Sequence, residues 1–186
     1  MMQTRPFSRT VLRLLERYAS EHSLEANECA RFLAFARIGE HWFERTRQDG
    51  HFTASCWLVS RDGLRVLLTH HRKLGRWLQL GGHADGDPDL AQVCLREAEE
   101  ESGIAGLQLE PGVFDLDAHQ IPLRGEVSAH IHWDVRFIVR CTHSEQWQIS
   151  DESLALAWVP IDTIAHDESA DSSLRRMARK WLERPC

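Results

Sequence analysis

The chain has 186 residues, of which 42% are hydrophobic and 27% are charged, the balance of an ordinary globular protein. Its net charge of −6 disfavours binding of long nucleic acid, although a local basic patch or a bound metal would suffice for a small phosphorylated ligand. No apolar run approaches the ~20 residues that span a bilayer, and the N-terminus lacks the apolar core of a secretory signal, so we expect a cytoplasmic protein that does not enter a membrane. The five scattered cysteines disfavour a disulfide framework or a structural zinc site.

The first part of the chain, residues 7–47, is expected to be helical. Two segments, FSRTVLRLLERYAS and CARFLAFARIGEHWFERTR, carry apolar residues at helical spacing and are separated by EHSLEAN. We interpret their apolar positions as core, with a homodimer contact or a lid over a pocket as weaker alternatives. The domain prediction is a helical extension over residues 1–48 and a second domain over residues 49–186.

From residue 51 the pattern changes to short strands. TASCWLVS and LRVLLTHH flank an Arg-Asp-Gly turn and predict a β-hairpin. The strand WLQL leads to Gly81-Gly82, and a helix is expected from about Pro88 to Ser102. VFDLDAHQIPL, AHIHWDVRFIVR and LALAWVPI predict further strands, and SSLRRMARKWLE predicts a closing helix. Helices and strands that interleave without strict βαβ regularity predict an α/β domain with a mixed sheet.

The expected helix ends in LREAEEESGI, which gathers four glutamates within five residues. On a helical wheel three of them share the sector of the apolar side chains: Glu97, Glu100 and Glu101, beside Leu90, Val93 and Cys94. Carboxylates at this spacing repel one another, and partial burial increases the repulsion. A divalent cation with oxygen ligands removes that cost. The wheel therefore favours a metal site over the alternative, a solvated acidic face.

The flanks of this helix carry their own signals. Asp87 is expected to cap it with Pro88 in the first helical position, and Gly103 is expected to stop it. Upstream, Gly81-Gly82 allows close approach of the backbone to a ligand, so that a carbonyl can join a metal shell; a plain tight turn is the alternative.

Together these residues resemble the Nudix box, G-x5-E-x7-R-E-U-x-E-E-x-G-U, in which U is apolar. The matching positions are Gly82, Arg96, Glu97, Ala98, Glu100, Glu101, Gly103 and Ile104. One position departs, because Pro88 replaces the first glutamate; Asp85, Asp87 or Asp89 could take over its supporting role. The resemblance extends more weakly over about residues 51–165.

The resemblance implies a Nudix-like α/β/α sandwich around a mixed sheet, with the N-terminal helices outside it. It implies an enzyme that hydrolyses a diphosphate linkage in a nucleoside diphosphate joined to another moiety. Glu97, Glu100 and Glu101 would then ligate Mg²⁺ or Mn²⁺ with help from the Gly81 carbonyl, and Arg96 would orient the glutamates. The metals would neutralise the diphosphate and activate a water for in-line attack on phosphorus.

Some members of the family draw a further acid from the loop before the last strand. Glu152, in SDESLALAW, is the candidate for that extra ligand or general base, with Glu145 as the second choice. Either could instead be a solvated loop acid.

The strand AHIHWDVRF alternates, with His130, His132, Asp134 and Arg136 on one face. Solvent exposure is one interpretation of that face, and lining of a substrate cleft by His132 or Arg136 is another. A transition-metal site ranks below both, because no further ligand is spaced convincingly nearby.

The turn HHRKLGRW concentrates basic side chains in an acidic chain. Lys73 and Arg76 are the candidates for phosphate contacts, and His83, just after the glycine pair, could face the metal site. Trp77 or Trp133 could stack on a nucleobase, and nothing in the sequence selects one of them.

Two other functions compete with hydrolysis. A nucleotide-sensing module would bind without cleaving, but such modules tend to lose box glutamates, and only Pro88 favours this alternative. An isoprenyl diphosphate isomerase shares the fold, but it needs an acid–base cysteine in a strand motif that this sequence lacks. The sequence therefore predicts a hydrolase, without a signature for any one nucleotide substrate.

Overall fold

The computed structural model describes residues 6–38, 41–123, 125 and 127–184. The helices and strands follow in this order: α1 (Pro6–Glu21), the 3₁₀ helix η1 (Ser23–Glu25), α2 (Ala26–Arg37), β1 (Gly50–Val59), β2 (Arg65–His71), β3 (Arg76–Leu78), β4 (Leu80–His83), α3 (Leu90–Ser102), β5 (Gln108–Leu109), β6 (Asp115–Ile121), β7 (His130–Arg140), β8 (Ser153–Pro160), α4 (Ile161–His166) and α5 (Ser172–Leu182).

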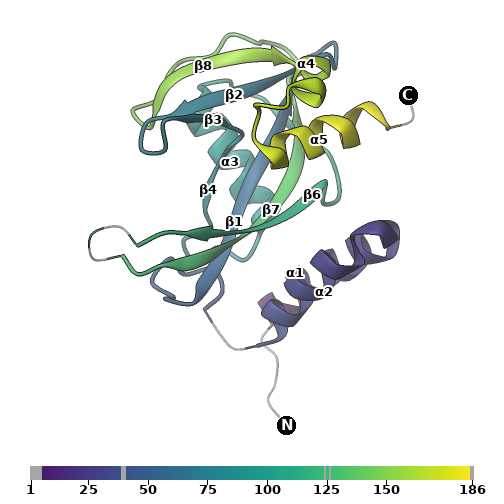
Figure 1. Ribbon diagram of the computed structural model, residues 1–186, viewed down its shortest axis with the longest axis vertical. Coiled ribbons are helices and arrows are strands. Elements are labelled where there is room, and N and C mark those ends of the chain that lie inside the picture. The colour runs from purple at the N-terminus through teal and green to yellow at the C-terminus, as the bar shows by residue number, and fades with distance from the viewer. Residues whose placement is uncertain (1–5, 39–40, 124, 126, 185–186) are drawn as a thin grey trace. The chain divides into compact units, whose positions relative to one another are not determined.

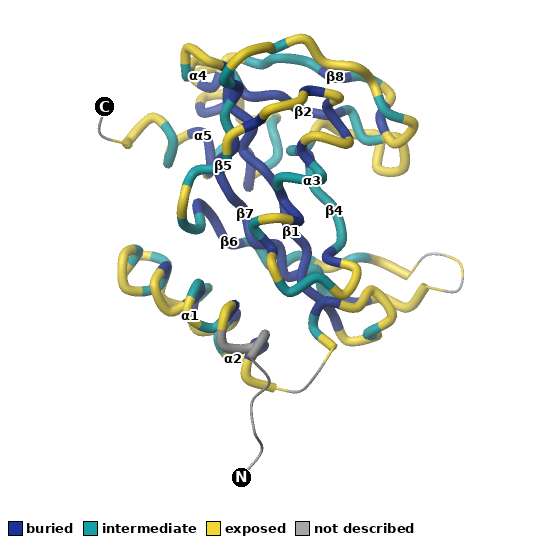
Figure 2. The backbone as a smooth tube through the Cα atoms, turned by 180° about the vertical axis from the view of Figure 1, so that it is seen from behind, coloured by how far each residue is buried: buried dark blue, intermediate teal, exposed yellow. Residues whose placement is uncertain are grey.

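The strands form one sheet, in the order β3-β2-β1-β7-β5, with β4 paired to β1, β6 to β7 and β8 to β2. The predicted hairpin is present, since Val59 of β1 lies opposite Val66 of β2 in an antiparallel pair. Strand β1 is buried along its whole length (Figure 2). An α/β fold with a mixed sheet and flanking helices, as predicted, is what the chain adopts.

The chain divides into two compact units. One contains the described residues up to Ala54 together with Gly82–Val93 and Pro111–Arg136, and the other contains Ser55–Gly81, Cys94–Glu110 and the described residues from Phe137 onward.

In the first unit, α1 packs alongside α2 (Figure 1). Phe35 of α2 stacks on Trp133 of β7, with ring centroids 4.5 Å apart, and meets the edge of Phe52 of β1 at 5.2 Å. Phe32 is fully buried and meets the edge of Trp133 at 5.1 Å. The interpretation as core is confirmed for Phe32 and Phe35, because aromatic contacts bury them within the chain itself, and is wrong for Ile38, which is 66% exposed.

The second predicted helix ends earlier than expected. It stops at Arg37, Ile38 is extended with φ −100° and ψ 92°, and Trp42 and Phe43 lie in a turn segment rather than in a helix. The prediction of helix up to residue 47 is wrong, because β-branched Ile38 and the following Gly39 in the sequence both disfavour helix.

In the second unit, β2 pairs with both β3 and β8, and α4 packs against α5 (Figure 1). Arg179 of α5 donates from Nε to the Ala165 carbonyl of α4 at 3.2 Å. The predicted single strand WLQL is two strands, β3 and β4, interrupted at Gln79. None of the helices in the described part of the chain has the length and apolarity needed to cross a membrane.

Candidate active site

Helix α3 carries the glutamates, and its start differs from the prediction. Asp89, not Asp87, caps it, since its carboxylate accepts from the Gln92 amide at 3.2 Å. Asp87 accepts from the Asp89 amide at 2.9 Å. Pro88 therefore precedes the cap instead of occupying the first helical position, because the helix begins at Leu90.

The three box glutamates lie at graded depths on α3. Glu101 is buried, with 6% of its surface exposed, and its Oε2 accepts from the Gly81 amide of β4 at 3.2 Å. The side chain of Glu97 is 17% exposed and that of Glu100 is 65% exposed. An ion can therefore reach Glu100 from solvent, while Glu101 is held in the interior by its hydrogen bond to the Gly81 backbone.

Arg96 connects two of these acids. Its Nη2 donates to Glu97 Oε1 at 3.0 Å, and its Nε lies 4.0 Å from Glu100 Oε1. Neighbouring guanidinium contacts of this kind fix carboxylate orientation, which is the role that the box resemblance implies for this residue.

Burial and mutual repulsion raise the pKa of two of the acids. For Glu101, burial is the main cause; the Gly81 amide opposes it, the charges of Glu97, Glu152 and Glu100 add to it, and the pKa reaches about 8. Burial also raises the pKa of Glu97, against the lowering effect of Arg96. Buried carboxylates that also repel one another are the kind of group that a divalent cation stabilises.

The charge of Glu152 acts on both Glu97 and Glu101, so this loop acid belongs to the same electrostatic cluster. Its loop is held by Arg72, the residue that follows β2. The Arg72 amide donates to the Glu152 carbonyl at 3.0 Å, and its guanidinium donates to the carbonyls of Asp151 at 2.8 Å and Ser153 at 3.1 Å. The sequence did not single out Arg72, because backbone carbonyls leave no motif.

Glu145, the second choice for the extra acid, is occupied elsewhere. Its Oε1 accepts from the Arg61 amide and its Oε2 from Arg65 Nη2, both at 2.8 Å. These contacts tie it to the β1–β2 hairpin, so the geometry favours Glu152.

The acids around Pro88 serve their own loop. Asp85, in a left-handed conformation with φ 50°, forms a two-point ion pair with Arg45. Asp87 and Asp89 accept the amide hydrogen bonds that start α3. Pro88 replaces the first glutamate of the box, and the nearby acids Asp85, Asp87 and Asp89 all make contacts with neighbouring residues.

The basic turn between β2 and β3 is exposed. Lys73 and Arg76 both reach solvent, and Arg76 lies 3.6 Å from Asp171 at the start of α5. Trp77 is 39% exposed and stacks on His70, whereas Trp133 is 8% exposed among the aromatic side chains of the first unit. Of the two tryptophans, only Trp77 presents surface to a ligand.

The polar face of β7 is buried, so the interpretation of that face as solvent-exposed is wrong. Arg136 is 2% exposed and pairs with Asp134 at 2.8 Å, Asp115 at 3.3 Å and Asp117 at 3.2 Å. Thr53 donates to Asp134 at 2.9 Å. The guanidinium of Arg136 is surrounded by three carboxylates. These ion pairs give Arg136 a structural role, and its guanidinium is not available to bind a phosphate.

Three histidines meet in the first unit: His51 of β1, His83 of β4 and His132 of β7. Their candidate ligand atoms all lie within 4.8 Å of one another. Burial and the neighbouring imidazoles lower the pKa of His51 to about 4, against a partial opposing effect of the Arg47 carbonyl, and lower that of His132 to about 2. The sequence did not single out His51, although a histidine in the largely apolar segment GHFTASCWLV was a signal that could have found it.

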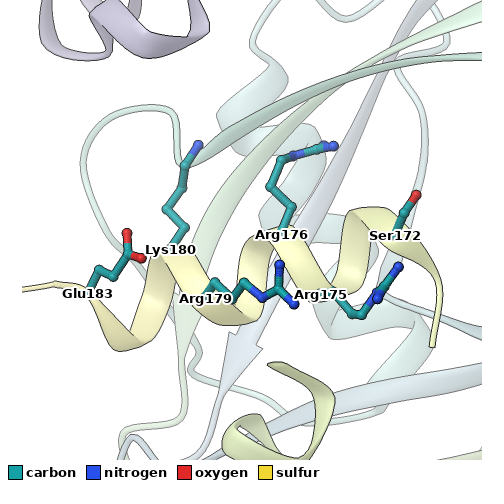
Figure 3. Close-up of a pocket in the computed structure, with 6 residues that line it drawn as sticks. All are labelled: Ser172, Arg175, Arg176, Arg179, Lys180 and Glu183. Carbon is teal, nitrogen blue, oxygen red and sulfur yellow. The ribbon is translucent and has the colours of Figure 1, made fainter. Parts of the chain in front are cut away.

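A concave surface of about 420 Å³ lies along α5 and involves none of the predicted site residues. Its lining is mostly basic: Ser172, Arg175, Arg176, Arg179, Lys180 and Glu183. Figure 3 shows Arg176 and Lys180 on one side of the helix and Arg175 and Arg179 on the other. The basic side chains thus diverge around the helix and do not converge on one ligand.

Several proteins of known structure are similar to this chain. Solved structures with the same fold include RenU, a Nudix hydrolase from M. Smegmatis, at 21% identity and a TM-score of 0.55 over 80% of this chain and 98% of that one. A C. elegans Ap4A hydrolase complex matches at 16% identity and 0.55, over 70% and 94%. The E. coli dihydroneopterin triphosphate pyrophosphohydrolase matches at 18% and 0.53, over 69% and 92%. No curated protein sequence matches the chain.

The match of the sequence to a family model is stronger evidence than these similarities of structure. Residues 50–181 match the family model of the NUDIX domain, which covers most of the chain. This match confirms the resemblance read from the box and, with it, the prediction of a Nudix-type hydrolase of phosphoanhydride bonds. The chain belongs to the Nudix family.

Proposed function

We propose that the protein is a metal-dependent nucleotide pyrophosphohydrolase that cleaves the diphosphate linkage of a nucleoside diphosphate joined to another moiety. The observation that carries this proposal is the carboxylate cluster of Glu97, Glu100 and Glu101, into which the charge of Glu152 also reaches. The proposed location is the cytoplasm, and the proposed domain boundary is near residue 49.

The donor set fits Mg²⁺ or Mn²⁺. Glutamate oxygens and a backbone carbonyl are hard ligands, which these ions prefer over nitrogen or sulfur. Burial, with smaller contributions from the neighbouring acids, raises the pKa of Glu101 to about 8, and a divalent ion would favour the charged form of this carboxylate. Glu97, Glu100, Glu101 and the carbonyl of Gly81 would hold the ion. When bound, the metal supplies charge neutralisation of the diphosphate and activation of a water.

The remaining roles fall to side chains of the same unit. Arg96 holds Glu97 and Glu100 in orientation, and Glu152 accepts a proton from the attacking water or adds a ligand. Exposed Lys73 and Arg76 contact the diphosphate, and half-exposed Trp77 stacks on the base. For His83 and His132, a contact with the substrate stays a prediction.

The test is release of phosphate or nucleoside monophosphate from a panel of nucleoside diphosphate derivatives, with Mg²⁺ or Mn²⁺ present. Glu100→Gln and Glu101→Gln remove one charge each with little change in shape, and we expect turnover to fall by about 10³-fold or more in both. Glu99→Gln is the matched control, since Glu99 is an exposed acid on the same helix outside the metal set.

Two outcomes would contradict the proposal. Turnover that persists without a divalent ion would remove the metal from the mechanism. If no compound is hydrolysed while some bind the wild type tightly, the protein is a nucleotide-sensing module, and the Pro88 departure from the box gains weight.

A further inference from the structure

The three histidines of the first unit come from three neighbouring strands. β1 pairs with β4 and with β7, so His51 lies on the strand between those that carry His83 and His132. The ring centroids are 5.2 Å apart for His51 and His83, 4.8 Å for His51 and His132, and 5.0 Å for His83 and His132. Three imidazoles from adjacent strands thus converge on one point.

Two of these rings have buried nitrogen atoms that lack the hydrogen bonds which buried polar groups normally make. His51 is 1% exposed, and neither of its ring nitrogens has a hydrogen-bond partner of normal geometry; the same holds for Nε2 of His132. A buried polar atom that is left unsatisfied destabilises the folded state. Apart from the effect of the Arg47 carbonyl on His51, these nitrogens are unsatisfied and lie among other imidazoles, as expected of groups that can ligate a metal.

We propose that His51, His83 and His132 form a binding site for a late first-row transition-metal ion, and that Zn²⁺ is the ion it fits best. Neutral imidazole nitrogen suits zinc, copper and nickel, whereas Mg²⁺ and Mn²⁺ prefer oxygen ligands. Nitrogen ligands about 2.0–2.1 Å from a tetrahedral zinc lie about 3.3 Å apart. The candidate ligand atoms of the three rings lie within 4.8 Å of one another, so binding of an ion would draw them closer together.

The surroundings support this assignment. His130 orients its ring by a 2.8 Å contact between Nδ1 and the Ser128 carbonyl, and its ring centroid lies 5.0 Å from that of His51. His119, opposite His132 in the β6–β7 pair, contacts the Asp117 carboxylate through Nδ1 at 3.0 Å. The three proposed protein ligands leave one position of a tetrahedral ion for water or a small ligand.

The site shares no residue with the glutamate cluster, and the experiment uses that. Cobalt(II) replaces zinc and gives a visible absorption spectrum in tetrahedral nitrogen sites, so it is titrated into the full chain that carries Glu100→Gln and Glu101→Gln. We expect one equivalent of cobalt to bind, to resist excess Mg²⁺ and to be displaced by Zn²⁺. Zinc should also raise the unfolding temperature, because the ion joins three strands.

His132→Gln in the same background should weaken cobalt binding by about 100-fold or more. His119→Gln is the matched control, a neighbouring histidine outside the trio, and should retain the spectrum. Since His132 is partly buried, His83→Gln on another strand repeats the test, with circular dichroism as the check of the fold. Absence of a tetrahedral cobalt spectrum, or its survival in folded His83→Gln, would overturn the proposal. These readouts do not involve hydrolysis, so they are independent of the proposed function.

Discussion

The glutamate cluster of α3 and the histidine cluster of β1, β4 and β7 respond to burial in opposite ways. Burial raises the pKa of Glu101 to about 8, which keeps a proton on a group that must lose it to bind a metal. Burial lowers the pKa of His51 to about 4, which frees the nitrogen that a metal needs. The glutamate site therefore needs its ion to hold its charge, whereas the histidine site is ready for an ion at neutral pH.

Arg136 provides a third cluster for this comparison, because it neutralises buried carboxylates with a side chain and without an added ion. Replacing Arg136 by Met leaves Asp115 and Asp134 buried without their cation, and we expect a loss of about 3–5 kcal/mol in the free energy of unfolding, measured with urea. The control is Arg140→Met on the same strand, because the side chain of Arg140 is 37% exposed and pairs with Glu110. This substitution should lower the free energy of unfolding by about 1 kcal/mol or less. Equal effects in the two variants would refute the structural role given to Arg136.

Arg72 tests the glutamate side. It is a positioning residue, since its contacts reach the backbone of the loop that carries Glu152 and no reacting group. Arg72→Ala should lower kcat by about 10–100-fold with little change in KM, because the acid loses its placement rather than its charge. Arg72→Lys should recover part of the loss by keeping one donor. An effect on KM alone would assign Arg72 to substrate binding instead.

The pH dependence of stability sharpens the comparison further. In metal-free protein, Glu101 has a folded pKa of about 8 against 4.5 in its ordinary state, so the folded chain binds more protons between these values. Its contribution is therefore complete below about pH 4.5 and is lost as the pH rises through 8, by about 2 kcal/mol after allowance for relaxation.

His51 and His132 have the opposite sign. Their folded pKa values lie below the ordinary 6.5, so their contribution is present above 6.5 and is lost as the pH falls. Urea unfolding from pH 5 to 8.5 in EDTA should show a decline above pH 6.5 that Glu101→Gln reduces. A decline that is unchanged in Glu101→Gln would show that another group causes it.

Gly103, which ends the glutamate helix, gives the smallest effect. It has φ +68°, and a Cβ there would lie 2.9 Å from the Cβ of Gln148 and 3.3 Å from its backbone nitrogen. Gly75 has nearly the same φ, +65°, but open space around it, so Gly75→Ala isolates the backbone strain. Gly103→Ala should cost about 1 kcal/mol more than Gly75→Ala in thermal unfolding. Equal losses would mean that the loop at Gln148 yields freely.

The two clusters also differ in how far the sequence predicts them. Residues three and four apart share a helix face, so Glu97, Glu100 and Glu101 can be grouped from their spacing alone. The contact of His51 with His132 depends on the pairing of strands that lie far apart in the sequence, which no local pattern encodes. For this reason a metal site on AHIHWDVRF ranked low from the sequence, since His51 and His83 lie on other strands.

Errors in the fold have similar origins. The polar alternation of β7 predicted a solvent face, but the ion pairs of Arg136 satisfy that face in the interior, where alternation no longer reports exposure. Asp87 and Asp89 are both good caps two residues apart, and only the geometry chooses Asp89. The hairpin and the box were predictable because their signals lie within a few residues, whereas the start of α3 was predicted two residues too early.

Manganese binding tests the central claim most directly, because free Mn²⁺ gives an electron paramagnetic resonance signal that is lost on binding. Wild type, Glu101→Gln and His132→Gln are titrated with Mn²⁺ at pH 7.5. We expect the wild type to bind Mn²⁺, Glu101→Gln to lose this binding and His132→Gln to keep it, since Mn²⁺ prefers carboxylate oxygen. Binding that survives in Glu101→Gln but is lost in His132→Gln would contradict it, and would place the hydrolytic metal at the histidines.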